Sequence, residues 1–67
     1  MIKSVFQVPD VEHQGDIDYF KSIIQDAGGT ILRVVWNEEE DDDVAYIVFQ
    51  CRDKNHKKEI KQKLENE

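Results

Sequence analysis

The period at which apolar side chains recur changes along the chain, and this change most constrains the fold. Residues 2–8 follow the two-residue period of a β-strand. Residues 16–27 carry apolar side chains at the spacing of an amphipathic helix, and so, more sparsely, do residues 54–66. Residues 30–36 and 44–51 are rich in the β-branched and aromatic types that favour strands. The sequence therefore predicts a single α+β domain over residues 1–67, with the order β-α-β-β-α.

This order matches the ferredoxin-like βαββαβ unit without its last strand. The second and third strands are expected to form a hairpin, and the first strand to lie beside the third, giving a three-stranded sheet of order 2-3-1. The first and third strands are expected to run parallel, and both helices to cover one face of the sheet.

Short polar and glycine signals mark where the helices begin and end. Residues 9–15 are predicted to be a loop, and Asp16 is predicted to cap the first helix with its carboxylate. Gly28-Gly29 is expected to end that helix. Asp53 is predicted to cap the last helix, whose two strong apolar positions suggest weak packing and a frayed end.

The strand patterns also predict an apolar surface opposite the helices. One alternate set of the third strand is expected to face the core, which leaves Val44, Tyr46 and Val48 on the open face beside Val5. The second strand is apolar on both faces, so it presents there either Ile31 and Val35, or Leu32, Val34 and Trp36. An open face is normally polar, so a partner or a second copy is predicted to cover this one, unless the domain tolerates exposed apolar side chains. The free edge of residues 2–8 is a second possible site of pairing with another chain. The side chains of the third strand that are expected to face the core are Ala45, Ile47, Phe49 and Cys51.

Composition excludes several classes of function. The net charge of -6 disfavours direct binding to nucleic acid and permits a basic partner. The sequence contains neither an apolar run long enough to span a membrane nor the apolar stretch of a signal peptide. The single cysteine cannot form an internal disulfide, so a reducing, cytoplasmic location is expected.

Charge is unevenly distributed. Residues 1–50 contain three basic and eleven acidic residues, whereas residues 51–67 contain six basic and four acidic ones. In the last helix, lysines recur at helical spacing and form one stripe, which is interpreted as a solvated face or as a contact for phosphate or an acidic protein. The stripe comprises Lys54, Lys57, Lys58 and Lys61.

The acidic run between the second and third strands has three interpretations. It lacks the spacing and the central glycine of a calcium loop, which disfavours metal binding. An extended conformation would repeat Glu38, Glu40 and Asp42 on one side every ~6.7 Å, about twice the ~3.4 Å rise of nucleic-acid phosphates, and could mimic their backbone. The remaining interpretation is a solubilising hairpin tip. The run comprises Glu38, Glu39, Glu40, Asp41, Asp42 and Asp43.

Catalytic chemistry has little support. Cys51 is expected to be inert packing on the core side of its strand, His56 to be exposed in the first turn of the last helix, and His13 to lie in a loop. A nucleophilic Cys–His pair needs contact between the two side chains, and zinc needs four ligands with paired spacing. We therefore predict no enzyme activity, no cofactor and no metal site.

Gly15 before the first helix, Ala27-Gly28-Gly29 after it, and the hairpin and helix that follow are similar in pattern to an ACT-type regulatory domain. The fourth strand of that domain has no counterpart here. The resemblance implies a small effector bound by residues 10–16, and pairing of two copies through sheets or helices.

The leading hypothesis is a non-enzymatic interaction module, a small acidic inhibitor or adaptor encoded by a phage or mobile element. It would occupy a surface of a larger protein, for example one that binds nucleic acid. Trp36 and Tyr46, with Val48 beside them, are predicted anchors, and Glu38 to Asp43 are predicted to steer association. The alternative is an ACT-like homodimeric sensor of a small molecule.

Overall fold

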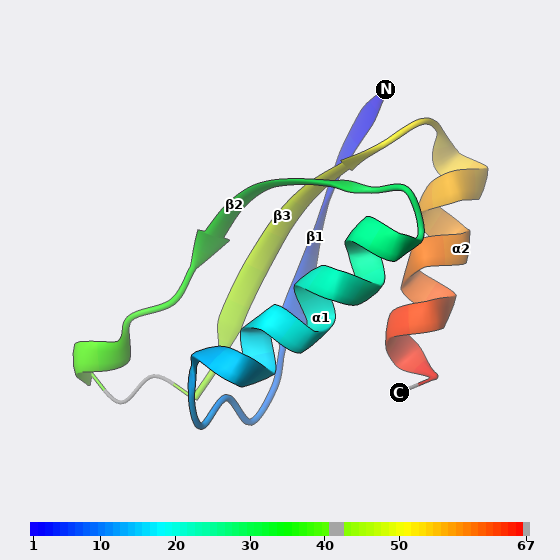
Figure 1. Ribbon diagram of the computed structural model, residues 1–67. Helices are drawn as coiled ribbons and strands as arrows, with labels where there is room; N and C mark the ends of the chain where they lie inside the picture. Colours follow the sequence, from blue (N-terminus) through cyan, green and yellow to red (C-terminus); the bar gives the residue numbers. More distant parts are fainter. Residues whose placement is uncertain (41–42, 67) are drawn as a thin grey trace.

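A computed structural model describes residues 1–40 and 43–66 of the 67-residue chain (Figure 1). It confirms an α+β domain with the predicted order of helices and strands, and a short 3₁₀ helix is added before the third strand. The elements are β1 (Ile2–Val8), α1 (Gln14–Asp26), β2 (Thr30–Val35), η1 (Glu38–Glu40), β3 (Ala45–Cys51) and α2 (Lys54–Glu65).

The sheet has the predicted strand order, with β3 between β1 and β2. However, β1 and β3 are antiparallel, so the prediction of a parallel pair was wrong. The reason is geometric: α1 carries the chain back along the sheet, so β2 runs in the same direction as β1, and the β2–β3 hairpin then reverses the chain once more.

A bulge in β2 decides which of its side chains face the helices. Ile31 lies opposite Phe49, but Arg33, not Leu32, lies opposite Val48. The extra residue inverts the alternation, as β-bulges do. After it, Val34 lies opposite Ile47 on the core side and Val35 lies opposite Tyr46 on the open side. Neither predicted set holds: Ile31, Val34 and Trp36 are partly buried against the core.

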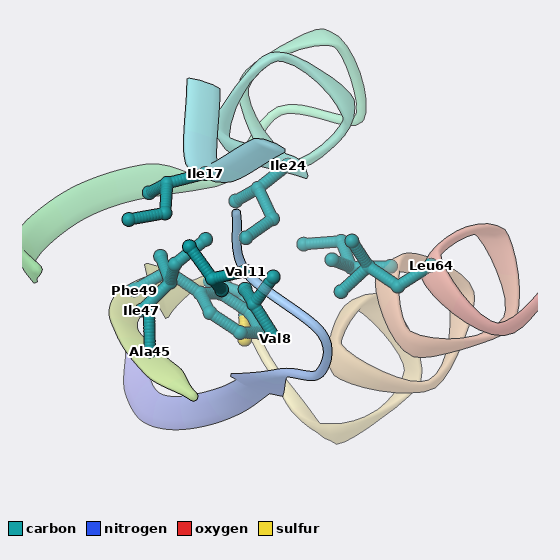
Figure 2. Close-up of a cluster of buried hydrophobic side chains, with 10 residues drawn as sticks. Val8, Val11, Ile17, Ile24, Ala45, Ile47, Phe49 and Leu64 are labelled. Carbon is teal, nitrogen blue, oxygen red and sulfur yellow. The ribbon is translucent and has the colours of Figure 1, made fainter. Parts of the chain in front are cut away.

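The core lies between one face of the sheet and the two helices. In Figure 2, Ile17 and Ile24 of α1 and Leu64 of α2 point toward Phe49 and the other inward side chains of the sheet. The predicted core face of β3 is confirmed, because its four inward side chains are all buried. The buried hydrophobic residues are Val8, Val11, Ile17, Ile24, Ala45, Ile47, Phe49, Cys51, Ile60 and Leu64.

The first helix begins three residues earlier than predicted, because its N-cap is His13 and not Asp16. His13 is the cap: its Nδ1 accepts a hydrogen bond from the Gly15 N–H at 3.0 Å. Asp16 lies in the third helical position, and its carboxylate accepts from the N–H groups of Glu12 (2.8 Å) and His13 (3.3 Å). His13 and Asp16 thus form a reciprocal capping box, which satisfies the Gly15 amide in the first turn and the Glu12 and His13 amides before the helix.

The second helix is tied to the domain by a residue that the sequence analysis misplaced. Asp53 caps the helix as predicted, accepting from the His56 N–H at 2.8 Å. His56, expected to be exposed, is only 4% exposed. Its Nδ1 accepts from the Arg52 N–H (3.0 Å) and its Nε2 lies 2.7 Å from the Ala27 carbonyl oxygen. Because Nδ1 is an acceptor, Nε2 carries the proton and donates it to Ala27, which joins the ends of α1 and α2.

The turn after α1 requires both of its glycines. Gly28 has a positive φ of 89°, which side chains other than glycine rarely adopt. A Cβ on Gly29 would lie 2.7 Å from the Ile24 Cγ2 atom and 3.2 Å from the Ile60 Cδ1 atom. The glycine pair therefore ends the helix, as predicted, and also lets both helices approach this turn closely.

Candidate functional site

The side of the sheet that faces away from the helices carries an exposed apolar patch, which we call the outer sheet face. Val5 lies opposite Val48, and Tyr46 lies opposite Val35. The exposed fractions of Val5, Val35 and Tyr46 are 49%, 43% and 43%. Leu32, forced out of register by the bulge, is 45% exposed next to this patch. The outer sheet face therefore comprises Val5, Leu32, Val35, Tyr46 and Val48, and by register Lys3, Gln7, Arg33 and Gln50 lie on the same side of the sheet.

The structure does not bring the two predicted aromatic anchors together. Tyr46 and Val48 lie on the outer sheet face, but Trp36 packs against the core on the opposite side. The bulge at Leu32 is the cause, because it changes the face on which every later residue of β2 lies. Both faces of β2 are apolar, so the alternation of its residues does not show that Val35 and Leu32 lie at this site.

The acidic run starts as a helix, not as an extended segment. Glu38–Glu40 form η1, in which successive residues rise only about 2 Å. The prediction that Glu38 and Glu40 recur every ~6.7 Å along an extended segment, as needed to match alternate phosphates, is therefore wrong. Asp41 and Asp42 lie outside the described residues. Asp43 is exposed, and its carbonyl oxygen accepts a hydrogen bond from the Val11 N–H at 2.8 Å. This bond joins the loop after β1 to the segment that leads into β3.

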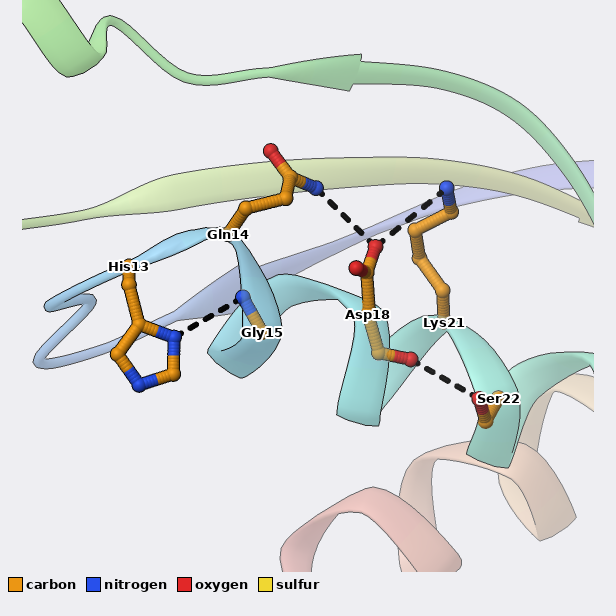
Figure 3. A network of polar contacts seen from close by, with 6 residues as sticks. All are labelled: His13, Gln14, Gly15, Asp18, Lys21 and Ser22. Atoms are coloured by element: carbon orange, nitrogen blue, oxygen red, sulfur yellow. Dashed lines mark hydrogen bonds and ion pairs between the residues drawn. The ribbon is translucent and has the colours of Figure 1, made fainter.

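The N-terminus of α1, where the ACT resemblance implies an effector, is occupied by groups of the protein itself (Figure 3). The Gly15 N–H is bonded to the His13 ring, and the Asp16 carboxylate holds the two preceding amides. The hydrogen bond from the Glu12 N–H, followed by the one from His13, lowers the pKa of Asp16. An effector would have to displace these bonds, so the geometry lends this interpretation no support.

A polar chain continues along the exposed side of α1. The Asp18 carboxylate accepts from Gln14 Nε2 at 3.1 Å and lies 4.0 Å from Lys21 Nζ, while Ser22 Oγ donates to the Asp18 carbonyl. These are exposed contacts between neighbouring turns of one helix. Such contacts stabilise a helix modestly and do not by themselves form a binding site.

The thiol and the two imidazoles are engaged in structural contacts. Cys51 Sγ is buried and lies 3.8 Å from the carbonyl oxygens of Ile2 and Asp53. His13 caps α1 and His56 links the two helices. Among residues 1–40 and 43–66 there is no group of three His, Cys, Asp or Glu that could hold a metal ion. No helix in this part of the chain is long and apolar enough to cross a membrane.

Comparison with known proteins gives no relative. The chain matches no model of a known protein family, no curated protein and no solved structure.

Proposed function

We propose that the chain is a non-enzymatic interaction module, an inhibitor or adaptor whose outer sheet face binds a larger protein. The observation that carries this proposal is the concentration of large apolar side chains on a sheet face that neither helix covers. The open face of an antiparallel sheet is normally polar, and a patch of this kind is typical of a protein-binding surface. Tyr46, next to Val35 and Val48, is the natural anchor.

The acidic end of the β2–β3 hairpin supports a partner with a basic surface. Glu39, Glu40 and Asp43 are exposed beyond the end of the sheet, so they can act on a partner during its approach. Charges at the rim of an interface mainly raise the association rate and its sensitivity to salt. A nucleic-acid-binding protein has such a surface, and we propose this class of partner. The single buried thiol is compatible with the cytoplasm as the location.

The test is a pull-down from host lysate with a matched pair of tyrosine variants. Tyr46 is 43% exposed on the outer sheet face, and Tyr19 is 51% exposed on α1, so Tyr46→Lys and Tyr19→Lys make the same chemical change on different surfaces. We expect one stoichiometric partner that the wild type and Tyr19→Lys retain and Tyr46→Lys loses, while the melting temperatures of both variants are checked.

A second set of variants tests the acidic end. Neutralising the six acids from Glu38 to Asp43 to Gln or Asn should slow association and flatten its salt dependence, while Tyr46→Lys should mainly accelerate dissociation. Equal recovery of the partner by both tyrosine variants would remove the outer sheet face from the proposal. Recovery of a second copy of the chain alone, with a doubled mass in light scattering, would replace the partner by a homodimer.

A further inference from the structure

A groove of about 600 Å³ lies between the start of β1 and the exposed side of α2. Most of its lining belongs to α2, which packs on the opposite side of the sheet from the outer sheet face, whereas Lys3 shares the side of β1 that carries Val5. The predicted lysine stripe of α2 lines this groove together with two residues of β1. The lining residues are Ile2, Lys3, Lys54, Lys57, Lys58, Lys61, Gln62 and Glu65.

The groove concentrates positive charge in a chain whose net charge is -6. Five lysines and one glutamate line it. Within residues 1–40 and 43–66, none of these five lysines has a carboxylate within ion-pair distance, although Lys21 pairs with Asp18 elsewhere. Because five lysines outnumber the glutamate among the described lining residues, the lysines repel one another, and an anionic ligand would relieve this repulsion as well as gain attraction.

The same groove borders an unpaired strand edge. β1 pairs with β3 on one side, and no other described strand pairs with it on the opposite side. Alternate residues of an edge strand direct their backbone N–H and C=O groups away from the sheet. Figure 1 shows α2 beyond β1 on the side away from β2, and Ile2 and Lys3 line the groove, so the lysines of α2 border the start of this strand edge.

These two properties identify one kind of occupant. An extended peptide can hydrogen-bond to the β1 edge, and acidic side chains on the peptide can reach the lysines of α2. A nucleic acid could satisfy the lysines but not the strand edge, and the described residues that line the groove include none of the aromatic side chains on which single-stranded bases stack. We infer that this groove binds an extended acidic segment of a partner protein as an added strand on β1, independently of the proposed function of the outer sheet face.

The test is fluorescence polarisation with the full chain and a labelled peptide of alternating Glu and Val, 7 residues long to match β1. We expect saturable binding that weakens as salt is raised. Methylating the peptide nitrogens that face β1 should abolish binding at unchanged peptide charge, because it removes the backbone donors. Hydrogen exchange of alternate β1 amides should slow when the unmethylated peptide binds.

Charge variants of α2 separate a built groove from a general charge effect. Lys57→Glu and Lys61→Glu should each weaken binding by about fivefold, because an attraction between exposed charges becomes a repulsion. Lys63→Glu makes the same charge change on α2 outside the groove and should leave the affinity within about twofold. Glu65→Gln should tighten binding, since it removes the acid found among the described lining residues.

Four results would overturn this inference. The first two are an equal loss of peptide affinity in Lys57→Glu and Lys63→Glu, and an affinity for the methylated peptide equal to that for the unmethylated one. The third is a single-stranded oligonucleotide of equal charge that binds more tightly than the peptide. The fourth is self-association of the chain that Lys57→Glu abolishes. The Tyr46→Lys variant should bind the peptide like the wild type, so failure of the groove and failure of the outer sheet face are distinguishable.

Discussion

Replacing the buried His56 by alanine should destabilise the domain more than replacing an exposed histidine such as His13. The imidazole is buried, its Nε2 donates to the Ala27 carbonyl at 2.7 Å, and its Nδ1 accepts from the Arg52 N–H at 3.0 Å. A net hydrogen bond contributes about 1 kcal/mol, but Arg52 is exposed and water can replace part of that bond. Loss of the packed ring adds about 1 kcal/mol. We expect a total loss of about 2–3 kcal/mol.

That loss is a large fraction of the stability of a domain this small. At about 0.05–0.15 kcal/mol per residue, 67 residues correspond to about 3–10 kcal/mol. Each kcal/mol shifts the melting temperature of such a domain by about 4–8 °C. His56→Ala should therefore melt at least about 8 °C below the wild type in circular dichroism, and its urea midpoint should fall with little change in slope.

Two further variants separate the contributions of packing and hydrogen bonding. His56→Phe keeps an aromatic ring at this position, although a larger one, and loses both bonds, so it should lie between His56→Ala and the wild type. His13→Ala removes an exposed cap and should lose about 1 kcal/mol. If His56→Ala and His13→Ala melted at the same temperature, or if ring-nitrogen spectra placed the proton of neutral His56 on Nδ1, the proposed link between the helices would be refuted.

Three more predictions follow from individual contacts. Ser4 Oγ is buried without a hydrogen-bond partner among the described residues, so Ser4→Ala should raise the free energy of unfolding by about 1 kcal/mol. The control Ser22→Ala, at an exposed position, should change it by less than about 0.5 kcal/mol. A lower melting temperature for Ser4→Ala would show that the hydroxyl has a partner. Gly29→Ala should lower the free energy of unfolding in urea by about 1–3 kcal/mol, because its Cβ would meet the Ile24 side chain at 2.7 Å and the Ile24 carbonyl oxygen at 3.1 Å. The Cβ of Gly15→Ala would meet only the exposed His13 ring, so this variant should lose less stability. The reverse ranking would contradict the packing at the turn. The Asp16 pKa is lowered from its ordinary value of 3.8, chiefly by the Glu12 N–H, so its carboxylate stabilises the fold above that pH, and this stabilisation is lost as the pH falls through the lower pKa of the folded state. The melting temperatures of wild type and Asp16→Asn should therefore converge in that acidic range, and a difference that is constant with pH would count against the capping role.

Local patterns in the sequence were sufficient to predict the helices and strands and the buried sides of β1 and β3. The alternation of residues 2–8 and of Ala45 to Cys51 is a property of each strand alone, so the buried sides followed from it. Gly28-Gly29 and Asp53 act on adjacent backbone groups, so their roles could also be predicted. The cap of α1 was missed because histidine is an unusual N-cap, although Asp16 three residues later is a signal that points back to it.

The features that define the candidate surfaces depend on contacts between residues far apart in the chain. The bulge at Leu32 arises in the pairing of β2 with β3, and it sends Trp36 to the core and Val35 to the outer sheet face. The buried His56 is satisfied by a distant residue, because its Nε2 donates a hydrogen bond to the Ala27 carbonyl, 29 residues away. The sequence by itself determined which segments are strands and helices, since hydrophobic period is local. Only the tertiary structure decided which side chains share a surface, because both faces of β2 are apolar and a single extra residue chooses between them.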